Sequence, residues 1–450
     1  GQNHFRHARS HVHGFVSLQL CLLHHLDVVV AAINGDRLSW HENLGNGNFS
    51  AYQTINDYHD GPRGVVAADM DGDNLPDLVV VNRQEEDEIG AGLVWYRNLG
   101  DANFELVDTL MAGGWHEYVH VEDMDNDGDL DILSCHALDE LDWLANDGNG
   151  NFGAPQELAR NVVYIRYVET PDLNNDGRPD LLYGASDDTP ERQTVLWRAS
   201  TDAGEWAQQA LVAIGGGNYS KPALADFDQD GLLDVVVGSP GSEALLWLKN
   251  EGFTFSVPRL IARRANYEPN TVEAHDFNND GWPDVLAGSV DDDFSSSSYF
   301  SVYINNQDGT FTPMPPFASG YLPQRDMELV DMDNDGDLDM LWANPGWNSS
   351  TANASLGWVR NDNLTWSEPI VLASEMINLL DVLVTDFDDD GQIDLVLCKR
   401  DAPQLVRMEH IGGGEFSSPQ IIPSDFVAGM YAQAADVDND GFIDLIASNE

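Results

Sequence analysis

A nine-residue acidic motif recurs eight times along the chain, and this repetition constrains the fold more than any other feature. The copies read DMDGDNLPD, DMDNDGDLD, DLNNDGRPD, DFDQDGLLD, DFNNDGWPD, DMDNDGDLD, DFDDDGQID and DVDNDGFID, and begin at residues 69, 123, 172, 226, 276, 331, 386 and 436. Their starts lie 49 to 55 residues apart. Such a period is the signature of a repeat architecture, in which each unit buries its apolar face against the next.

Short apolar segments surround each copy of the motif. Residues four and two positions before its first Asp are apolar in most copies, as at Val65 and Ala67, and this alternation predicts a strand. A continuous apolar run such as Leu78–Val81 follows the motif, as in a strand buried on both faces. A third segment carries an aromatic residue that we expect to pack in the core between repeats: Trp40, Trp95, Trp143, Trp197, Trp247, Tyr303 and Trp358. A Gly/Asn turn and a fourth strand led by Phe or Trp complete the unit, which predicts an all-β fold, a β-propeller of four-stranded blades.

The number of blades depends on how the ends of the chain are used. The motifs define seven complete units, and a half-repeat remains at each end, with strands expected at Asp27–Ala32 and Leu445–Ser448. Joining the two half-repeats in one blade leaves few exposed sheet edges and predicts an eight-bladed propeller. One strand is then redundant, so a seven-bladed ring with spare ends is the alternative. We expect residues 27–450 to form this single domain, and residues 1–26, which hold no acid and six of the 13 histidines, to be a tail outside the fold.

The motif itself has the composition of a calcium loop. Calcium takes six to eight oxygen ligands from carboxylates and carbonyls. Oxygen-bearing side chains stand at position one (Asp69, Asp123, Asp172, Asp226, Asp276, Asp331, Asp386, Asp436), position three (Asp71, Asp125, Asn174, Asp228, Asn278, Asp333, Asp388, Asp438), position five (Asp73, Asp127, Asp176, Asp230, Asp280, Asp335, Asp390, Asp440) and position nine (Asp77, Asp131, Asp180, Asp234, Asp284, Asp339, Asp394, Asp444). We expect position seven to offer its backbone carbonyl, since its side chain varies. Gly at position six, replaced by Asn74 in the first copy, permits a left-handed backbone.

The rival readings of the motif fit less well. An EF-hand requires Glu at position twelve and flanking helices, and no copy has that Glu. Metal-free turns explain one such loop but not eight in register, because several carboxylates within a few ångströms favour a bound cation. The sequence therefore predicts up to eight Ca²⁺ ions.

The charge of the chain excludes some partners. It has 77 acidic and 21 basic residues, a net charge of −56, which repels nucleic acid and anionic membranes. No apolar run is long enough for a transmembrane helix, so we expect no membrane insertion. The three cysteines form no disulfide framework, and Cys135 and Cys398, at matching positions of apolar strands, are expected to be buried thiols.

The acidic loop, the Trp strand and the turn such as NLGNGNF from Asn43 together resemble FG-GAP/VCBS-type repeats, the blades of integrin α-subunit propellers and of many secreted proteins. The resemblance covers residues 27–450. It implies that the Asp and Asn side chains at the four loop positions are Ca²⁺ ligands, and that the protein works outside the cell or at its surface. It leaves the function open, because the family includes adhesion receptors, assembly proteins, lectin-like binders and a few polysaccharide lyases.

Candidate ligand-binding residues stand where the inner strands begin, at the end opposite the acidic loops: Arg63, His116, Tyr118, Arg166, Lys221 and Arg325. Our leading hypothesis is a non-enzymatic extracellular scaffold that binds proteins, glycans or copies of itself, in adhesion or assembly, with no catalytic residue. The alternative is a calcium-dependent polysaccharide lyase acting at this face. One of the arginines would then neutralise a uronate carboxylate, and His116 or Tyr118 would abstract the proton.

Overall fold

The computed structural model describes residues 15–18, 27–32, 37–45, 48–57, 61–82, 92–100, 103–112, 116–136, 140–160, 165–185, 193–201, 205–207, 210–216, 221–239, 243–263, 268–290, 299–317, 326–344, 355–374, 379–387, 390–399, 404–422, 429–435 and 443–449. Every regular element in these ranges is a β-strand, which confirms the all-β prediction. The chain divides into two compact units, Gly1–Thr189 with Val195–Leu211 and Val437–Asp440, and Pro190–Thr194 with Val212–Asp436 and Gly441–Glu450.

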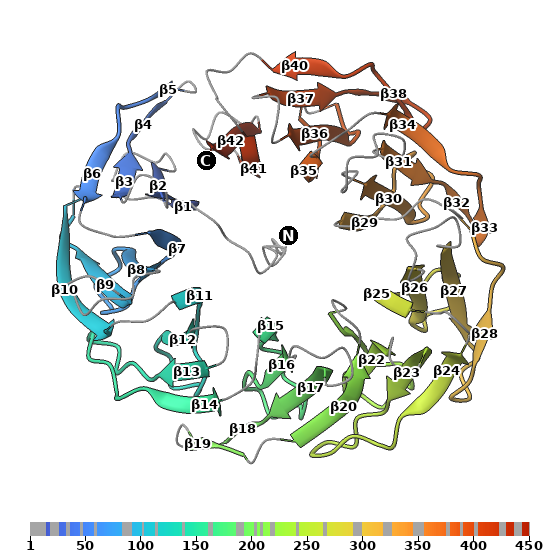
Figure 1. Ribbon diagram of the computed structural model, residues 1–450, viewed down its shortest axis with the longest axis horizontal. Coiled ribbons are helices and arrows are strands. Elements are labelled where there is room, and N and C mark those ends of the chain that lie inside the picture. Colours follow the sequence, from blue (N-terminus) through green and yellow to red (C-terminus); the bar gives the residue numbers. More distant parts are fainter. Residues whose placement is uncertain are drawn as a thin grey trace. The chain divides into compact units, whose positions relative to one another are not determined.

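Four four-stranded antiparallel sheets come from residues 15–216, and Figure 1 shows their strands side by side. The strands are β1 (Phe15–Leu18), β2 (Asp27–Ala32), β3 (Arg37–His41) and β6 (Gln53–Asn56); β7 (Pro62–Ala68), β8 (Asp77–Asn82), β9 (Leu93–Asn98) and β10 (Phe104–Met111); β11 (His116–Glu122), β12 (Asp131–His136), β13 (Glu140–Leu144) and β14 (Gln156–Arg160); and β15 (Ile165–Glu169), β16 (Leu181–Ala185), β17 (Gln193–Arg198) and β20 (Ala210–Gly216).

Four more sheets of the same kind come from residues 223–422. Their strands are β21 (Ala223–Ala225), β22 (Asp234–Ser239), β23 (Ala244–Leu248) and β24 (Arg259–Arg263); β25 (Glu268–His275), β26 (Asp284–Val290), β27 (Tyr299–Asn305) and β28 (Phe311–Pro313); β29 (Asp326–Val330), β30 (Asp339–Asn344), β31 (Ser355–Val359) and β34 (Ile370–Ser374); and β35 (Leu379–Thr385), β36 (Asp394–Lys399), β37 (Gln404–Met408) and β40 (Gln420–Ile422).

Five two-stranded sheets complete the described strands. Four are short pairs in the turn that leads into the fourth strand: β4 (Asn43–Gly45) with β5 (Asn48–Phe49), β18 (Ser200–Thr201) with β19 (Glu205–Trp206), β32 (Asn361–Asp362) with β33 (Thr365–Trp366), and β38 (His410–Gly412) with β39 (Glu415–Phe416). The fifth is β41 (Gly429–Ala435) with β42 (Asp444–Asn449). In each repeat whose acidic loop is described, that loop joins the first strand of a four-stranded sheet to the second.

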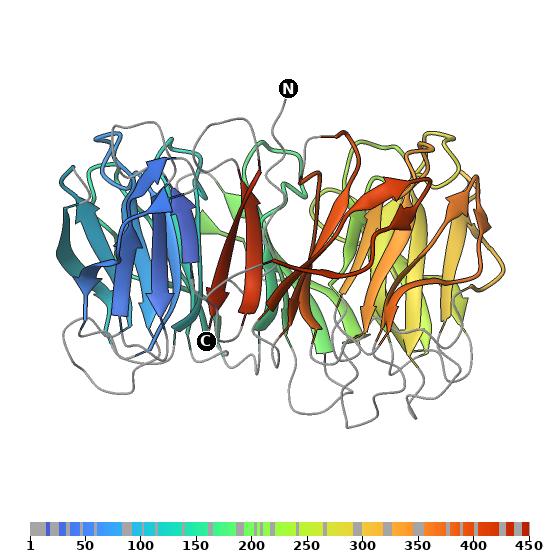
Figure 2. The same ribbon diagram turned by 90° about the horizontal axis from the view of Figure 1, so that it is seen from above.

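The core lies between the faces of successive sheets, because each sheet carries apolar side chains on both faces and buries them against its neighbours. Trp95 of β9 packs with Ile132 and Leu144 of the next sheet, and its ring meets Phe152 edge-on at 5.5 Å. Trp247 of β23 meets Phe311 of β28 in the same way at 5.9 Å. The third-strand aromatic residues are buried, which confirms their predicted role as core between repeats. In Figure 2 the strands of the blue and teal sheets of the first unit run upright.

Strand register corrects one member of this aromatic series. Trp95 pairs with Val79 and Trp247 with Val236, each two residues after the Asp at loop position nine. Tyr303 instead pairs with Val285, one residue after that Asp, and Val302 occupies the place of the tryptophan. The sequence concealed this one-residue offset, because the aromatic Tyr303 stands directly beside the position that the tryptophan has in other repeats.

The two ends of the chain differ from the prediction. Phe15–Leu18, which the sequence predicts to lie in a tail outside the fold, forms β1 and pairs antiparallel with β2, with Phe15 opposite Val30. The first sheet therefore has four strands without any from the C-terminus, and β41 and β42 form a two-stranded sheet of their own. The prediction that the two terminal half-repeats share one sheet is wrong in this respect. A strand edge accepts any extended segment with free backbone groups, and a segment that precedes β2 in the chain fills this one.

Two further observations agree with the sequence. Cys135 and Cys398 are buried thiols, as expected, whereas Cys21 lies outside the described residues. Across the described part of the chain, no helix has the length and apolar character needed to cross a membrane.

Candidate metal centre

Two left-handed residues shape each described acidic loop. Position six has a positive φ, from 65° at Asn74 to 100° at Gly128, which confirms the role predicted for Gly and Asn there. Position four also has a positive φ, as at Asn126 (59°) and Gln229 (56°). The Asn residues at position four were a signal for this second reversal, because Asn tolerates the left-handed region. Together the two reversals turn the side chains of positions one, three and five toward one centre.

The carboxylates at positions one and five accept hydrogen bonds from the backbone of their own loop. In the second loop, Asp123 accepts the N–H groups of Asp127 and Gly128, both at 3.0 Å, and Asp127 accepts that of Asp129 at 3.0 Å. The pattern recurs in the loops that begin at Asp172, Asp226, Asp276, Asp331 and Asp386. Such Asx-type bonds hold the loop in shape through local contacts alone.

The carboxylate at position nine ties the loop to the sheet. Asp131 is fully buried, and its Oδ2 accepts the N–H of Met124 at 3.1 Å. Its Oδ1 accepts the N–H of Asn146, beyond the third strand, at 2.8 Å. The same two bonds occur at Asp77, Asp180, Asp234, Asp284 and Asp339. Position nine, which we predicted as a metal ligand, therefore also has a structural role that the sequence did not reveal.

The position-three carboxylate is the member of the set with a free oxygen. In four loops one of its oxygens is buried and has no hydrogen-bond partner: Oδ1 of Asp71, Asp125, Asp228 and Asp333. An ionised oxygen shielded from water without a donor is costly, and a bound cation removes that cost. These are also the four loops in which three carboxylates each bring one oxygen within 4.8 Å of the others.

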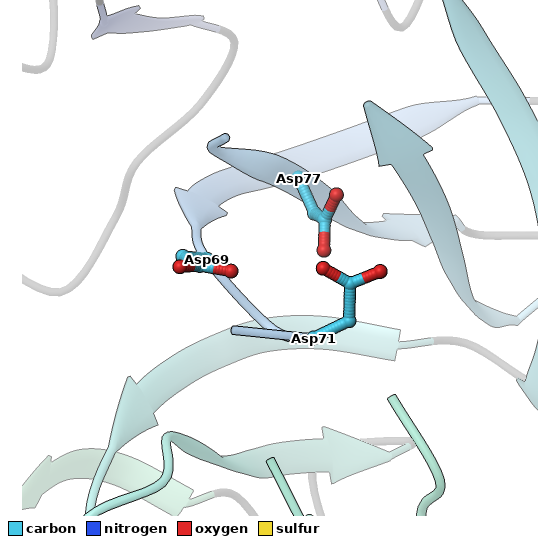
Figure 3. Close-up of side chains that lie close together, drawn as sticks. All are labelled: Asp69, Asp71 and Asp77. Carbon is cyan, nitrogen blue, oxygen red and sulfur yellow. The ribbon is translucent and has the colours of Figure 1, made fainter. Parts of the chain in front are cut away.

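The members of these clusters differ between loops. The first and sixth loops gather positions one, three and nine: Asp69, Asp71 and Asp77, and Asp331, Asp333 and Asp339. The second and fourth gather positions one, three and five: Asp123, Asp125 and Asp127, and Asp226, Asp228 and Asp230. Figure 3 shows the first cluster, in which the carboxylates of Asp71 and Asp77 point toward each other and Asp69 lies to one side. The donors are all hard carboxylate oxygens, which suits Ca²⁺ rather than a thiolate- or imidazole-binding metal.

The electrostatics of these sites also favour a cation. Burial is the main cause that raises the pKa of Asp77 to about 6 and those of Asp131 and Asp339 to about 7. Burial, followed by the charges of neighbouring aspartates, raises the pKa of Asp125 and of Asp333. A divalent ion at the centre would reverse this effect by attracting the ionised forms.

The predicted ligands differ between loops in their chemistry and in whether the structure describes them. The third and fifth loops have Asn174 and Asn278 at position three, so their centres hold one carboxylate fewer. Asp388, Asp436, Asp438 and Asp440 lie outside the described residues, and only the backbone of Asp444 is described. The sequence-based ligand assignments in those loops remain predictions.

An asparagine at the end of the third strand completes the site, and we did not predict its role. The side-chain amide of Asn146 donates to the carbonyl of Leu130 in its own loop, at 3.0 Å, and to that of Met70 in the preceding loop, at 2.8 Å. Asn305 does the same with Pro283 (3.1 Å) and Phe227 (2.8 Å). These bonds connect successive loops. The only signal in the sequence was an Asn recurring three residues after the core tryptophan.

The candidate ligand-binding residues at the opposite end of the strands are less accessible than expected. His116 is 1% exposed, and its Nδ1 lies 2.9 Å from the Ser134 hydroxyl. Burial raises the pKa of Tyr118 to about 12. Arg63 is partly buried in β7 and Lys221 is exposed, whereas the side chain of Arg166 and all of Arg325 lie outside the described part. β7 and β11 are neighbouring inner strands, so Arg63 and His116 share one end of two adjacent sheets.

Comparison with known proteins places the repeat in a family. A sequence model described as an FG-GAP-like repeat matches residues 24–80, 69–134, 123–183, 172–237, 226–287, 276–342, 331–397 and 386–447. No curated protein sequence matches the chain.

Two solved structures are similar to the chain at low identity. A Tc holotoxin pore structure from Photorhabdus luminescens aligns with 94% of this chain at 15% identity and a TM-score of 0.31. The chain spans 24% of that much longer protein. A structure titled BBS1N in complex with ARL6DN aligns with 73% of this chain and 88% of its own, at 12% identity and a TM-score of 0.36.

Proposed function

Because this chain belongs to the FG-GAP-like repeat family, we propose that its β-propeller is a calcium-stabilised, non-enzymatic scaffold that acts outside the cell or at its surface. It binds proteins or glycans, or joins copies of itself, in adhesion or assembly. The observation that carries the calcium part is the buried position-three oxygen without a hydrogen-bond donor, repeated at Asp71, Asp125, Asp228 and Asp333.

Calcium supply supports the proposed location. Loops of this kind have several exposed positions, and extracellular calcium modules bind their ion with a Kd of about 10⁻⁴ to 10⁻³ M. Such sites fill outside the cell, where calcium is plentiful. With 77 acidic residues in the chain, bound Ca²⁺ also lowers the repulsion that opposes a compact fold.

The outer strands support a binding function. Around β24, Phe253 is 74% exposed and Val257 is 83% exposed, and Leu260 of the strand itself is also exposed. Exposed apolar side chains in neighbouring parts of the chain are available for protein contacts. β24 is also an edge strand of its sheet, so part of its backbone is open to a partner.

Among the residues that the structure describes, no observation favours the lyase hypothesis. A general base must reach the proton that it removes, and His116 is buried against Ser134. Tyr118 has its pKa raised to about 12, so its phenolate is harder to form than that of an ordinary tyrosine. We therefore do not propose a catalytic function.

Calcium-dependent stability tests the proposal. We expect the melting temperature in about 10 mM calcium to exceed that in excess chelator by several degrees, because a site with a Kd of about 10⁻⁴ M is then held at about 100 times its Kd, which adds about 2.7 kcal/mol. Magnesium at the same concentration should give a smaller shift, since it retains its water shell. Equal melting curves in calcium and in chelator would refute the calcium assignment, and equilibrium dialysis would give the number of ions bound.

A further inference from the structure

Three of the four carboxylate clusters have a basic side chain beside them. In each case it lies two residues after the core tryptophan of the third strand and contacts Oδ2 of the position-three aspartate. Arg97 Nε is 2.7 Å from Asp71, Arg360 Nη1 is 3.9 Å from Asp333, and Lys249 Nζ contacts Asp228 and lies 2.8 Å from Oδ2 of Asp230. The buried tryptophan fixes the strand, so its second neighbour extends over the loop.

Each basic group contacts only one oxygen of the position-three carboxylate. In all three loops Oδ2 faces the basic side chain, and Oδ1 of the same carboxylate is the buried oxygen without a hydrogen-bond partner. The side chains of Asp71 and Asp333 are only 10% and 7% exposed. Oδ1 therefore stays available to a cation, although the positive charge of the Arg or Lys side chain already lies beside the cluster.

Lys249 is the most closely engaged of the three basic residues. Its ammonium group donates hydrogen bonds to Oδ2 of both Asp228 and Asp230. The pair neutralises part of the loop charge without any metal.

The second loop is built from the same carboxylates but has no such group. Ala145 stands two residues after Trp143, and the ion pairs of the described residues give Asp125 no basic partner. The Asp226 loop thus has a basic side chain beside its carboxylates, and the Asp123 loop has an alanine at the equivalent position. They form a natural comparison within one chain.

We propose that Lys249, Arg97 and Arg360 are internal counter-ions that set the calcium affinity of their loops. The Asp226 loop keeps its shape without calcium and binds the ion weakly, whereas the Asp123 loop depends on calcium and binds it tightly. This inference rests on the proposed calcium function. Its physical basis is Coulombic: a fixed positive charge within about 3–5 Å of a ligand oxygen stabilises the metal-free carboxylates and repels a divalent ion, and one such charge changes affinity by about tenfold or more.

Hydrogen exchange with peptide resolution tests the proposal on the full chain, because it reads each loop separately across a calcium titration. The reporters are the N–H groups of Asp230 and Gly231, which donate to Asp226, and those of Asp127 and Gly128, which donate to Asp123. In chelator we expect the Asp226 loop to be better protected than the Asp123 loop. The calcium midpoint should be lower for the Asp123 loop.

Two reciprocal variants and one control complete the experiment. Lys249→Met should remove the protection of the Asp226 loop in chelator and lower its calcium midpoint by about tenfold or more. Ala145→Lys should do the opposite in the Asp123 loop, and it carries the test alone if Lys249→Met fails to fold. Arg263→Met, an equal loss of charge on the exposed face of β24, should change neither loop.

The outcomes separate the two levels of the argument. Loops that respond to calcium but keep or raise their midpoint in Lys249→Met would overturn the counter-ion role, and would show that the lysine orients the ligands instead. No change of protection with calcium in any loop would refute the proposed calcium function itself.

Discussion

Replacing Asp125 by Asn should affect stability with opposite signs in the presence and absence of calcium. The change keeps an oxygen at position three but removes a negative charge from the Asp123 loop. In calcium, a drop from about 100 times Kd to near Kd lowers the free energy of unfolding by about 2 kcal/mol. For a unit of this size that corresponds to a fall in melting temperature of about 4–8 °C.

In chelator the same substitution should stabilise the protein. Asp125 has a buried oxygen without a donor, and its pKa is raised by burial and by the charges of Asp127 and Asp123. Removing that charge relieves the repulsion, and after allowance for solvent screening we expect a gain of about 0.5 kcal/mol, or about 1–2 °C. Differential scanning calorimetry in both buffers measures the two effects.

The control for this prediction is Asp108→Asn, an equal change of charge on an exposed position of β10. It should alter the melting temperature little in either buffer. A fall for Asp125→Asn in both buffers would refute the reasoning, because it would mean that the carboxylate has a protein partner and not a metal.

The remaining predictions concern the other loop positions. Asp131→Ala leaves two buried N–H groups without an acceptor, so chemical denaturation should show a loss of about 2–4 kcal/mol in chelator and a larger loss in calcium, and a loss confined to calcium would contradict the structural role of position nine. Asp335→Ala should reduce the calcium-dependent rise in melting temperature more than Asp337→Ala, because Asp335 offers a carboxylate and position seven only its carbonyl; equal reductions would show that the loop register is wrong. In chelator, burial raises the folded-state pKa values of Asp131 and Asp339 to about 7, above those of the unfolded chain. Their protonation therefore favours the folded state, and this stability is fully present below pH 4 and lost as the pH rises through about 7. In calcium the trend should reverse between about pH 5 and 7, since protons compete with the ion, and melting curves with the same pH trend in both buffers would refute this account.

Much of this protein could be predicted from short-range features of the sequence. The spacing of Asp residues defined the loops, and Gly or Asn at position six marked the left-handed turn that the structure has at Gly128 and Asn74. Apolar alternation around Val65 predicted strand β7, and the tryptophans predicted the core between sheets. These features were readable because backbone conformation and strand burial depend on neighbouring residues within one repeat.

The tertiary structure decided which loop carboxylates accept backbone hydrogen bonds and which keep an oxygen without a donor. Four loop positions carry the same chemical group, yet Asp131 accepts hydrogen bonds from two backbone N–H groups, while Oδ1 of Asp125 has no hydrogen-bond partner. Position alone does not distinguish them, because the N–H that engages Asp131 belongs to Asn146, a residue beyond the third strand.

The sequence by itself determined the repeat, the acidic loops and the four-stranded units, since each is encoded within about 50 residues of chain. Only the tertiary structure decided that Phe15–Leu18 completes the first sheet, that Lys249 lies against Asp228, and that the amide of Asn146 reaches the carbonyl of Met70. The physical reason is distance along the chain. Partners separated by many residues are chosen by which strand edges, charges and buried polar groups remain unsatisfied once the sheets have packed, and a local pattern does not specify that choice.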